Sequence, residues 1–187
     1  MDRKHKVAVI VGSLSKASIT RKVAKALIAV APPSLECAFV EIGELPLYTP
    51  DFEADPPPAV QAFRGHVRAA DALLFATPEY NRSVPGCLKN AIDVGSRPYG
   101  KSVWGGKPGA VVSVSPGVIG GFGANQHLRQ SFVFLDILAM QQPEAYIGGA
   151  AKLFDEQGTL VNDSTREFIT KFMQSFASFI ERVRAPA

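Results

Sequence analysis

The stretch Lys6–Thr20, KVAVIVGSLSKASIT, decides the fold of this chain. Its first part, Lys6–Val11, is a continuous apolar run rich in β-branched residues, which is typical of a strand buried on both faces of a parallel sheet. Gly12 and Ser13 end this strand, and Thr20–Ala31 follows with apolar residues at helical spacing. A strand, a short loop and a helix in this order predict the first part of a βαβ unit.

Strands and helices alternate along the rest of the chain. We predict strands at Leu35–Ile42, Leu73–Ala76, Ala110–Val114 and Ala145–Gly148, and helices at Ala59–Ala70, Gly86–Val94, Ala124–Met140 and Ser164–Val183. The last helix carries a phenylalanine stripe expected to be core, and Ser164–Glu167 (STRE) predicts a capping box at its start. Right-handed crossovers then give an α/β fold, a five-stranded parallel sheet with helices on both faces, and residues 1–187 are expected to form a single domain.

Composition narrows the classes of partner. The net charge of +3, without a Lys/Arg run, mildly favours anionic ligands and predicts no nucleic-acid partner. No apolar stretch is long enough to span a membrane, and the N-terminal residues lack the pattern of a signal peptide. We therefore expect no membrane insertion and a cytoplasmic location. Cys37 and Cys87 are far apart and are expected to be small buried residues.

In parallel sheets covered by helices, ligands bind beyond the carboxyl ends of the strands. The loop after the first strand, Gly12–Thr20, contains four hydroxyls and the ammonium of Lys16 just before a helix. A helix N-terminus has unpaired N–H groups and a partial positive charge, so this loop is a candidate phosphate site. The alternative is a helix cap, with Ser18 or Thr20 capping the helix and no ligand.

The loop after the third strand, Thr77–Pro85, reads TPEYNRSVP. Its prolines restrict the backbone at both ends, and polar and aromatic residues lie between them. Such a loop can present backbone N–H groups to the edge of a flat heterocycle, with Tyr80 shielding the ring. An ordinary exposed loop is the alternative.

Together, GSLSKAS at 12–18 and TPEYNRSVPGCLKNAID at 77–93 resemble the NADPH-dependent FMN reductase family, most closely its bacterial quinone and chromate reductase branch. GVIGG at 117–121 and HLRQ at 127–130 match the same branch, and the resemblance runs from about residue 6 to 184. It implies a flavodoxin-like sheet of order 2-1-3-4-5, FMN as cofactor, and NADPH or NADH as electron donor.

The resemblance also implies which residues bind the flavin. The phosphate is expected near Ser13, Ser15, Lys16, Ser18, Ile19 and Thr20, the pyrimidine edge near Pro78, Glu79, Tyr80 and Asn81, and the ring and ribityl chain near Ser115, Gly117 and Gly120. The family commonly has arginine in place of Ser15, so one charge on the phosphate is missing here. Lys16 or Arg21 would compensate for it.

The expected activity is reduction of quinones, and opportunistically of chromate or other oxidised metals, by ping-pong hydride transfer through FMN. Because the flavin carries this chemistry, we predict no catalytic acid, base or nucleophile. Three alternatives remain: a flavodoxin-type electron carrier, which would usually be acidic, a flavin reductase releasing reduced FMN, and a redox sensor. No metal site is expected, and His5, His66 and His127 are interpreted as surface or helix residues.

Substrate contacts are expected at Asn81, Arg82 and Arg97. Arg97 follows a helix whose other end adjoins the loop after the third strand, so it would reach a flavin only across a subunit interface. This predicts a homodimer or homotetramer with Arg97 at the mouth of a neighbour's site. The alternative is a surface arginine without a role.

Overall fold

A computed structural model describes residues 4–184 and gathers their strands into one parallel sheet. The strands are β1 (His5–Val11), β2 (Leu35–Phe39), β3 (Ala72–Pro78), β4 (Pro108–Val114), β5 (Leu138–Ala139) and β6 (Ala145–Ile147). Their order is β2-β1-β3-β4-β5, with β6 also paired to β4, so the predicted order is confirmed. Two short strands share the last position, because β5 pairs with the start of β4 and β6 with its end.

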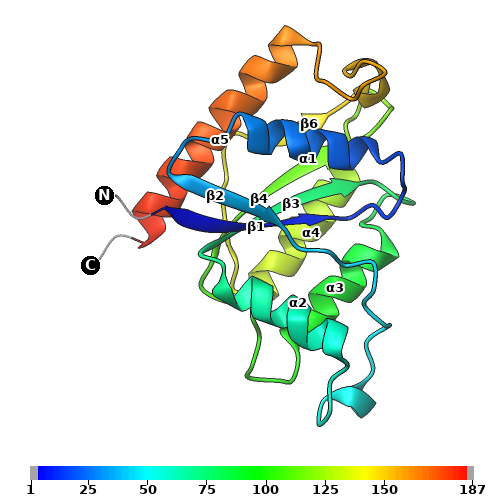
Figure 1. Cartoon of the computed structure of the whole chain (residues 1–187), viewed down its shortest axis with the longest axis vertical. Coiled ribbons are helices and arrows are strands. Elements are labelled where there is room, and N and C mark those ends of the chain that lie inside the picture. The colour runs from blue at the N-terminus through cyan, green and yellow to red at the C-terminus, as the bar shows by residue number, and fades with distance from the viewer. Residues whose placement is uncertain (1–3, 185–187) are drawn as a thin grey trace.

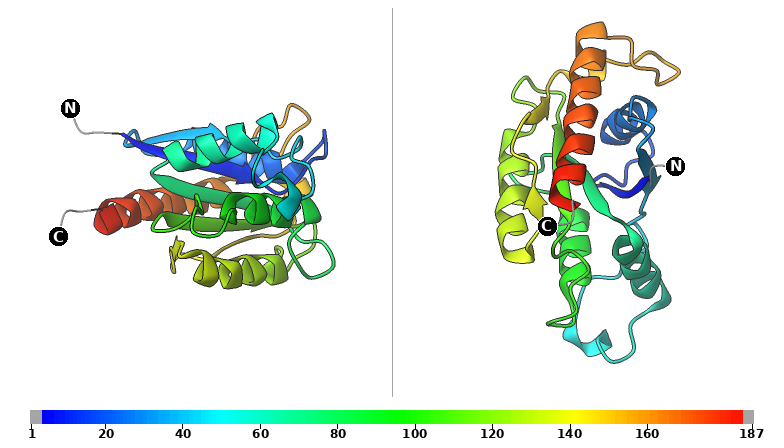
Figure 2. Two further views of the ribbon diagram at one scale, coloured as in Figure 1. Left: turned by 90° about the horizontal axis from the view of Figure 1, so that it is seen from below. Right: turned by 90° about the vertical axis from the view of Figure 1, so that its left-hand side faces the viewer.

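Helices cover both faces of this sheet, as predicted (Figure 1). They are α1 (Ile19–Ala29), α2 (Pro58–Ala69), α3 (Gly86–Ser96), α4 (Phe122–Leu135) and α5 (Asp163–Arg184), with 3-10 turns at Pro50–Phe52 and Ala150–Lys152. The right-hand view of Figure 2 looks along the strands, with α1 and α5 above the sheet and α2 and α3 below it. No helix within residues 4–184 is both long and apolar enough to cross a membrane.

Each face of the sheet has its own hydrophobic core. Under α1 and α5, the rings of Phe172 and Phe176 are fully buried, while Phe168 and Phe179 lie at the edge of that core. The predicted phenylalanine stripe is therefore core. On the other face, the ring of Phe75 lies 5.8 Å from that of Trp104 and 5.1 Å from that of Phe132, between centroids. Buried aromatic contacts of this kind help to hold α4 and the segment around Trp104 on the sheet.

The predicted helix Ala124–Met140 was wrong at both ends. Residues 122 and 123 are already helical, and α4 ends at Leu135, where Asp136 adopts a left-handed conformation with φ of +56°. Aspartate tolerates this conformation better than most residues. Ile137 and Met140 are buried after the helix has ended, and their spacing imitated a further helical turn.

The capping box predicted at Ser164–Glu167 was also wrong. The helix α5 begins at Asp163, and the side-chain oxygen of Asn162 accepts the backbone N–H of Thr165 at 2.8 Å. Asparagine is among the strongest N-cap residues, so the cap lies two residues earlier than the sequence pattern indicated.

Candidate functional site

The loops that follow β1, β3 and β4 leave the sheet at the same edge, on the right of Figure 1. The strands are in register up to this edge, with Val11 beside Ala76 and Thr77 beside Ser113. The backbone N–H of Gly12 also donates to the carbonyl of Ala76 at 2.8 Å, which extends the pairing into the first loop. The chain order reverses between β1 and β3, and ligands of this fold class bind at such a point.

The first loop has backbone donors without acceptors. Ser18 caps α1, because its hydroxyl accepts the backbone N–H of Arg21 at 3.0 Å. Within the described part of the chain, the N–H groups of residues 14–17, and those of Ile19 and Thr20, donate to no other residue. The predicted cap by Ser18 is thus confirmed, and it leaves donors at the helix N-terminus that an anion can accept.

The side chains of this loop divide into two groups. Ser15 and Lys16 are exposed and Ser13 is half-buried, whereas Ser18 and Thr20 are buried. A ligand outside the loop can therefore reach the first three side chains. At Ile19 and Thr20, which begin α1, the ligand would contact the backbone N–H groups.

Arg21, expected with Lys16 to compensate for Ser15, is paired with another residue in this structure. Its guanidinium makes two hydrogen bonds to the carboxylate of Glu41 and lies 4.5 Å from the ring centre of Phe39. These hydrogen bonds raise the pKa of Arg21 and lower the pKa of Glu41. Of the two cations expected to compensate for Ser15, Lys16 is therefore the one that is exposed in the loop and pairs with no carboxylate in residues 4–184.

The loop after β3 is a tight hairpin. Tyr80 and Ser83 exchange two backbone hydrogen bonds of 2.9 Å, and the residues between them, Asn81 and Arg82, have φ of +52° and +63°. Positive φ at both central residues is the geometry of a type I′ turn. A non-glycine residue in this region costs about 1–3 kcal/mol, so contacts around the hairpin must hold it in place.

Those contacts come from the start of α4. The carboxylate of Glu79, which is 12% exposed, pairs with Arg82 (2.8 Å) and accepts the backbone N–H of Ala124 (3.2 Å). A Cβ on Gly123 would lie 2.9 Å from both the Arg82 carbonyl and the Glu79 carboxylate, so the two segments touch. Glu79 was expected near the pyrimidine edge, but the contact of its side chain with α4 was not predicted from the sequence.

A second contact joins the same segments. The Nδ1 atom of His127 on α4 lies 2.9 Å from the hydroxyl of Ser83. His127 was interpreted as a helix or surface residue, and it is an exposed helix residue, but it also contacts the hairpin. Sequence spacing gave no signal for this contact, because 44 positions separate the two residues.

The loop after β4 is held by β6. The N–H of Ser115 donates to the carbonyl of Ile147 (3.0 Å), and the Ser115 hydroxyl accepts the N–H of Gly117 (3.1 Å). Gly120 has φ of +66°, and a Cβ there would lie 2.6 Å from the backbone of Tyr146. The contact with β6 therefore requires glycine at position 120, independently of any approach of a flavin to this loop.

Each of the three loops exposes large apolar side chains. They are Leu14 after β1, Tyr80 after β3, and Val118 and Ile119 after β4. We call these four residues the apolar rim. All are more than half exposed, which is unusual for such side chains unless they meet a ligand or a partner.

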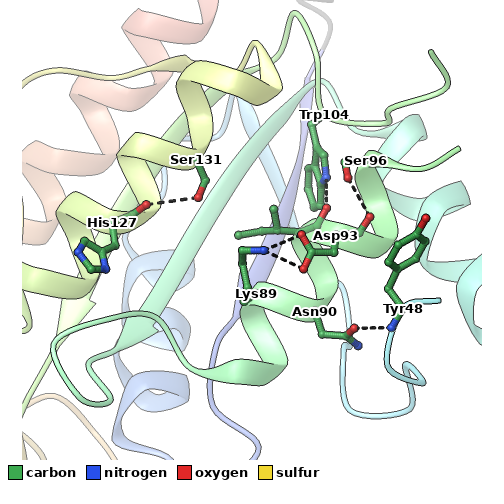
Figure 3. A network of polar contacts seen from close by, with 9 residues as sticks. Tyr48, Lys89, Asn90, Asp93, Ser96, Trp104, His127 and Ser131 are labelled. Carbon is green, nitrogen blue, oxygen red and sulfur yellow. Dashed lines mark hydrogen bonds and ion pairs between the residues drawn. The ribbon is translucent and has the colours of Figure 1, made fainter. Parts of the chain in front are cut away.

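Arg97 lies away from this site, as predicted for a single subunit. It follows α3, whose 11 residues span roughly 16 Å at 1.5 Å per residue, with the hairpin at the opposite end. There it lines a cavity of about 300 Å³ with Tyr48, Lys89, Asp93 and Phe134, among others. Figure 3 shows the polar contacts beside this cavity, including the ion pair of Lys89 with Asp93 (2.8 Å) and the hydrogen bond from the Tyr48 N–H to Asn90 (2.8 Å).

Neither cysteines nor metal ligands form a further centre in the described residues. Cys37 and Cys87 are free and partly buried, and burial raises the pKa of both thiols, that of Cys37 to about 11. Residues 4–184 contain no group of three or more His, Cys, Asp or Glu side chains placed to hold a metal ion.

Comparison with known proteins gives consistent results. The family model described as NADPH-dependent FMN reductase matches residues 5–152. The chain is 63% identical over 186 residues to a quinone reductase of Pseudomonas putida, covering 99% of this chain and 100% of that protein. It is 47% identical over 175 residues to a 2-hydroxy-1,4-benzoquinone reductase of a Burkholderia species, covering 94% and 96%. Among solved structures, the flavoenzyme NAD(P)H:(acceptor) oxidoreductase FerB of Paracoccus denitrificans is similar, with a TM-score of 0.90, 42% identity, and coverage of 95% and 98%.

Proposed function

This chain belongs to the NADPH-dependent FMN reductase family, and we propose on that premise that it passes reducing equivalents from NADPH or NADH through bound FMN to quinones. Membership makes it an oxidoreductase that uses FMN and NAD(P)H. The quinone acceptor is inferred from the relatives, among which a quinone reductase and a 2-hydroxy-1,4-benzoquinone reductase cover nearly the whole chain.

One observation carries the proposal. Unpaired backbone N–H groups at the start of α1 lie at the same sheet edge as the hairpin after β3 and the loop after β4. Helix-terminal donors suit a phosphate, and the neighbouring loops present a backbone edge and apolar side chains suited to a flat ring. The residues present therefore fit a flavin mononucleotide.

We assign the binding roles as follows. The side chains of Ser13, Ser15 and Lys16, the cap residue Ser18 and the N–H groups of Ile19 and Thr20 would hold the phosphate. Pro78, Glu79, Tyr80 and Asn81 would line the pyrimidine edge, and Ser115, Gly117 and Gly120 would adjoin the ring and ribityl chain. In this assignment the Glu79 side chain acts indirectly, since it is occupied by Arg82 and Ala124.

When bound, FMN supplies the hydride and electron chemistry, and the protein supplies orientation and electrostatics. The apolar rim would exclude water from the ring and favour flat apolar acceptors such as quinones. Asn81 and Arg82 at the hairpin tip would contact the substrate, although the pairing of Arg82 with Glu79 limits its reach. Chromate and similar oxyanions would be opportunistic acceptors.

The test is an anaerobic titration of purified protein with NADPH and with NADH. Prompt bleaching of the flavin absorbance, followed by reoxidation with a quinone, is expected. Slow bleaching would favour an electron carrier, and flavin lost on gel filtration would favour a flavin reductase that releases its product. A colourless protein that does not take up FMN would overturn the proposal.

We also propose that the functional unit is a homodimer or homotetramer, in the cytoplasm, with Arg97 reaching a neighbour's site. In support, the α4 residues Val133 and Phe134, the latter beside Arg97, are 84% and 83% exposed, and large apolar side chains exposed together favour a protein contact. Replacing Arg97 by alanine should raise KM for an anionic acceptor while sparing FMN content. An unchanged KM, or a monomer by sedimentation, would contradict this assignment.

A further inference from the structure

A small cavity of about 220 Å³ lies between α1, α5 and the turn that contains Gly158. Figure 1 shows α1 and α5 side by side above the sheet, and residues of both helices pack in the same core. Three cationic side chains line the cavity, those of Lys22 and Lys25 on α1 and of Arg166 on α5, and no carboxylate does. The flavin site assigned above uses none of these residues.

Two of the three cations have defined neighbours in the wall of this cavity. Gly158 has φ of +82°, and a Cβ there would lie 3.5 Å from Cε and 3.9 Å from Nζ of Lys22, so the lysine lies across the glycine. Arg166 donates one guanidinium hydrogen bond to the carbonyl of Leu160, which leaves its other N–H groups available. A donor held by a hydrogen bond, as Arg166 is, loses less entropy when a ligand binds than a freely rotating one.

The charge at this cavity is not balanced by nearby ion pairs. None of Lys22, Lys25 and Arg166 lies within ion-pair distance of a carboxylate in residues 4–184. The turn itself carries two carboxylates, those of Asp155 and Glu156, and neither lines the cavity or lies within ion-pair distance of its cations. That of Asp155 accepts the backbone N–H of Thr159 at 2.7 Å. Like charges brought together without a counterion repel each other, and a bound anion would relieve that repulsion.

We propose that this cavity is a second anion site, which binds a small multivalent oxyanion of the phosphate type. Its volume is below the range of about 300–1,000 Å³ typical of sites for drug-sized ligands, so a phosphoryl group fits better than a whole nucleotide. The charge of three cationic side chains is better balanced by the multiple negative charges of a pyrophosphate than by a monovalent anion. Because the donors come from both helices, a bound anion would bridge α1 to α5.

The test is isothermal titration calorimetry, in which pyrophosphate is titrated into protein saturated with FMN at low ionic strength. Inorganic phosphate and sulfate are titrated in separate experiments. Saturation fills the loop before α1, and constant flavin absorbance shows that it stays filled. The double variant Lys25→Gln/Arg166→Gln should weaken pyrophosphate binding at least tenfold. The matched control Lys171→Gln/Arg182→Gln removes the same charge elsewhere on α5 and should leave the affinity unchanged.

Three outcomes would overturn the site. In the first, pyrophosphate gives no more heat than sodium chloride of equal ionic strength. In the second, both double variants lose affinity for pyrophosphate equally, as expected for unspecific electrostatic attraction. Adenosine diphosphate could bind at least tenfold more tightly than pyrophosphate, which would contradict a site for a small oxyanion. Thermal unfolding of each variant without anion checks that the fold is retained.

Discussion

The carboxylate of Glu79, directly after the end of β3, accepts the backbone N–H of Ala124 in the first turn of α4 at 3.2 Å. A negative charge at a helix N-terminus is favourable, because the helix dipole and the unpaired N–H groups both attract it. The same carboxylate pairs with Arg82 in the strained hairpin. Glu79 thereby connects the hairpin after β3 to the start of α4, the helix that directly follows the loop after β4.

Replacing Glu79 by alanine should weaken FMN binding without abolishing the fold. Hydrogen bonds to charged groups contribute about 1.5–3 kcal/mol, and the loss of one should raise the Kd for FMN roughly tenfold or more. Fluorescence titration of apoprotein with FMN measures this. The control Glu167→Ala, at an exposed position on α5, should bind FMN normally. Equal affinity of both variants would refute a positioning role for Glu79.

Replacing Gly123 by alanine should disturb the same contact sterically. The new Cβ would lie 2.9 Å from the Arg82 carbonyl and the Glu79 carboxylate, and relief of such overlaps costs about 1–3 kcal/mol in stability at overpacked sites. The matched control is Gly86→Ala, because a Cβ at Gly86 meets nothing within 4 Å. Urea unfolding should show a loss of stability for the first variant and none for the second.

Ser15 offers a test of charge at the proposed phosphate loop. Its side chain is exposed, so Ser15→Arg and Ser15→Asp should leave the melting temperature of the apoprotein nearly unchanged. The arginine should tighten FMN binding and the aspartate should weaken it, each by several-fold, and salt should reduce the difference. If both variants bind FMN like the original chain at low salt, the phosphate lies elsewhere.

The thiol of Cys37 should make stability depend on alkaline pH. Burial raises its pKa from 9.0 to about 11, so between these values the unfolded chain loses the proton while the folded chain keeps it. The unfolded state is then favoured, and this contribution to stability declines as pH rises from about 9 towards 11. Urea unfolding of the original chain and of Cys37→Ala at both pH values measures the difference. Parallel pH profiles would contradict the assignment.

The alternation of strands and helices was predictable because each long β-strand is a distinct apolar run, as in Lys6–Val11, and each helix has its own periodicity. Once the strands were predicted, the loops after β1, β3 and β4 were predictable as the site, because the direction of parallel strands fixes the edge of the sheet at which these loops emerge. The short strand β5 was not, because two residues are too few to show a period. The contacts of Glu79 with Ala124 and of Ser83 with His127 join residues 45 and 44 positions apart, and no local pattern encodes such pairs.

The division of the outer edge of β4 between β5 and β6 has a consequence for behaviour at high concentration. A long, flat, unpaired strand at the border of a sheet is a template on which other molecules can add strands and polymerise. Here that border consists of strands of two and three residues, and the chain leaves the sheet between them. A foreign strand would find too few consecutive backbone groups to pair with, so this side of the molecule resists fibre growth.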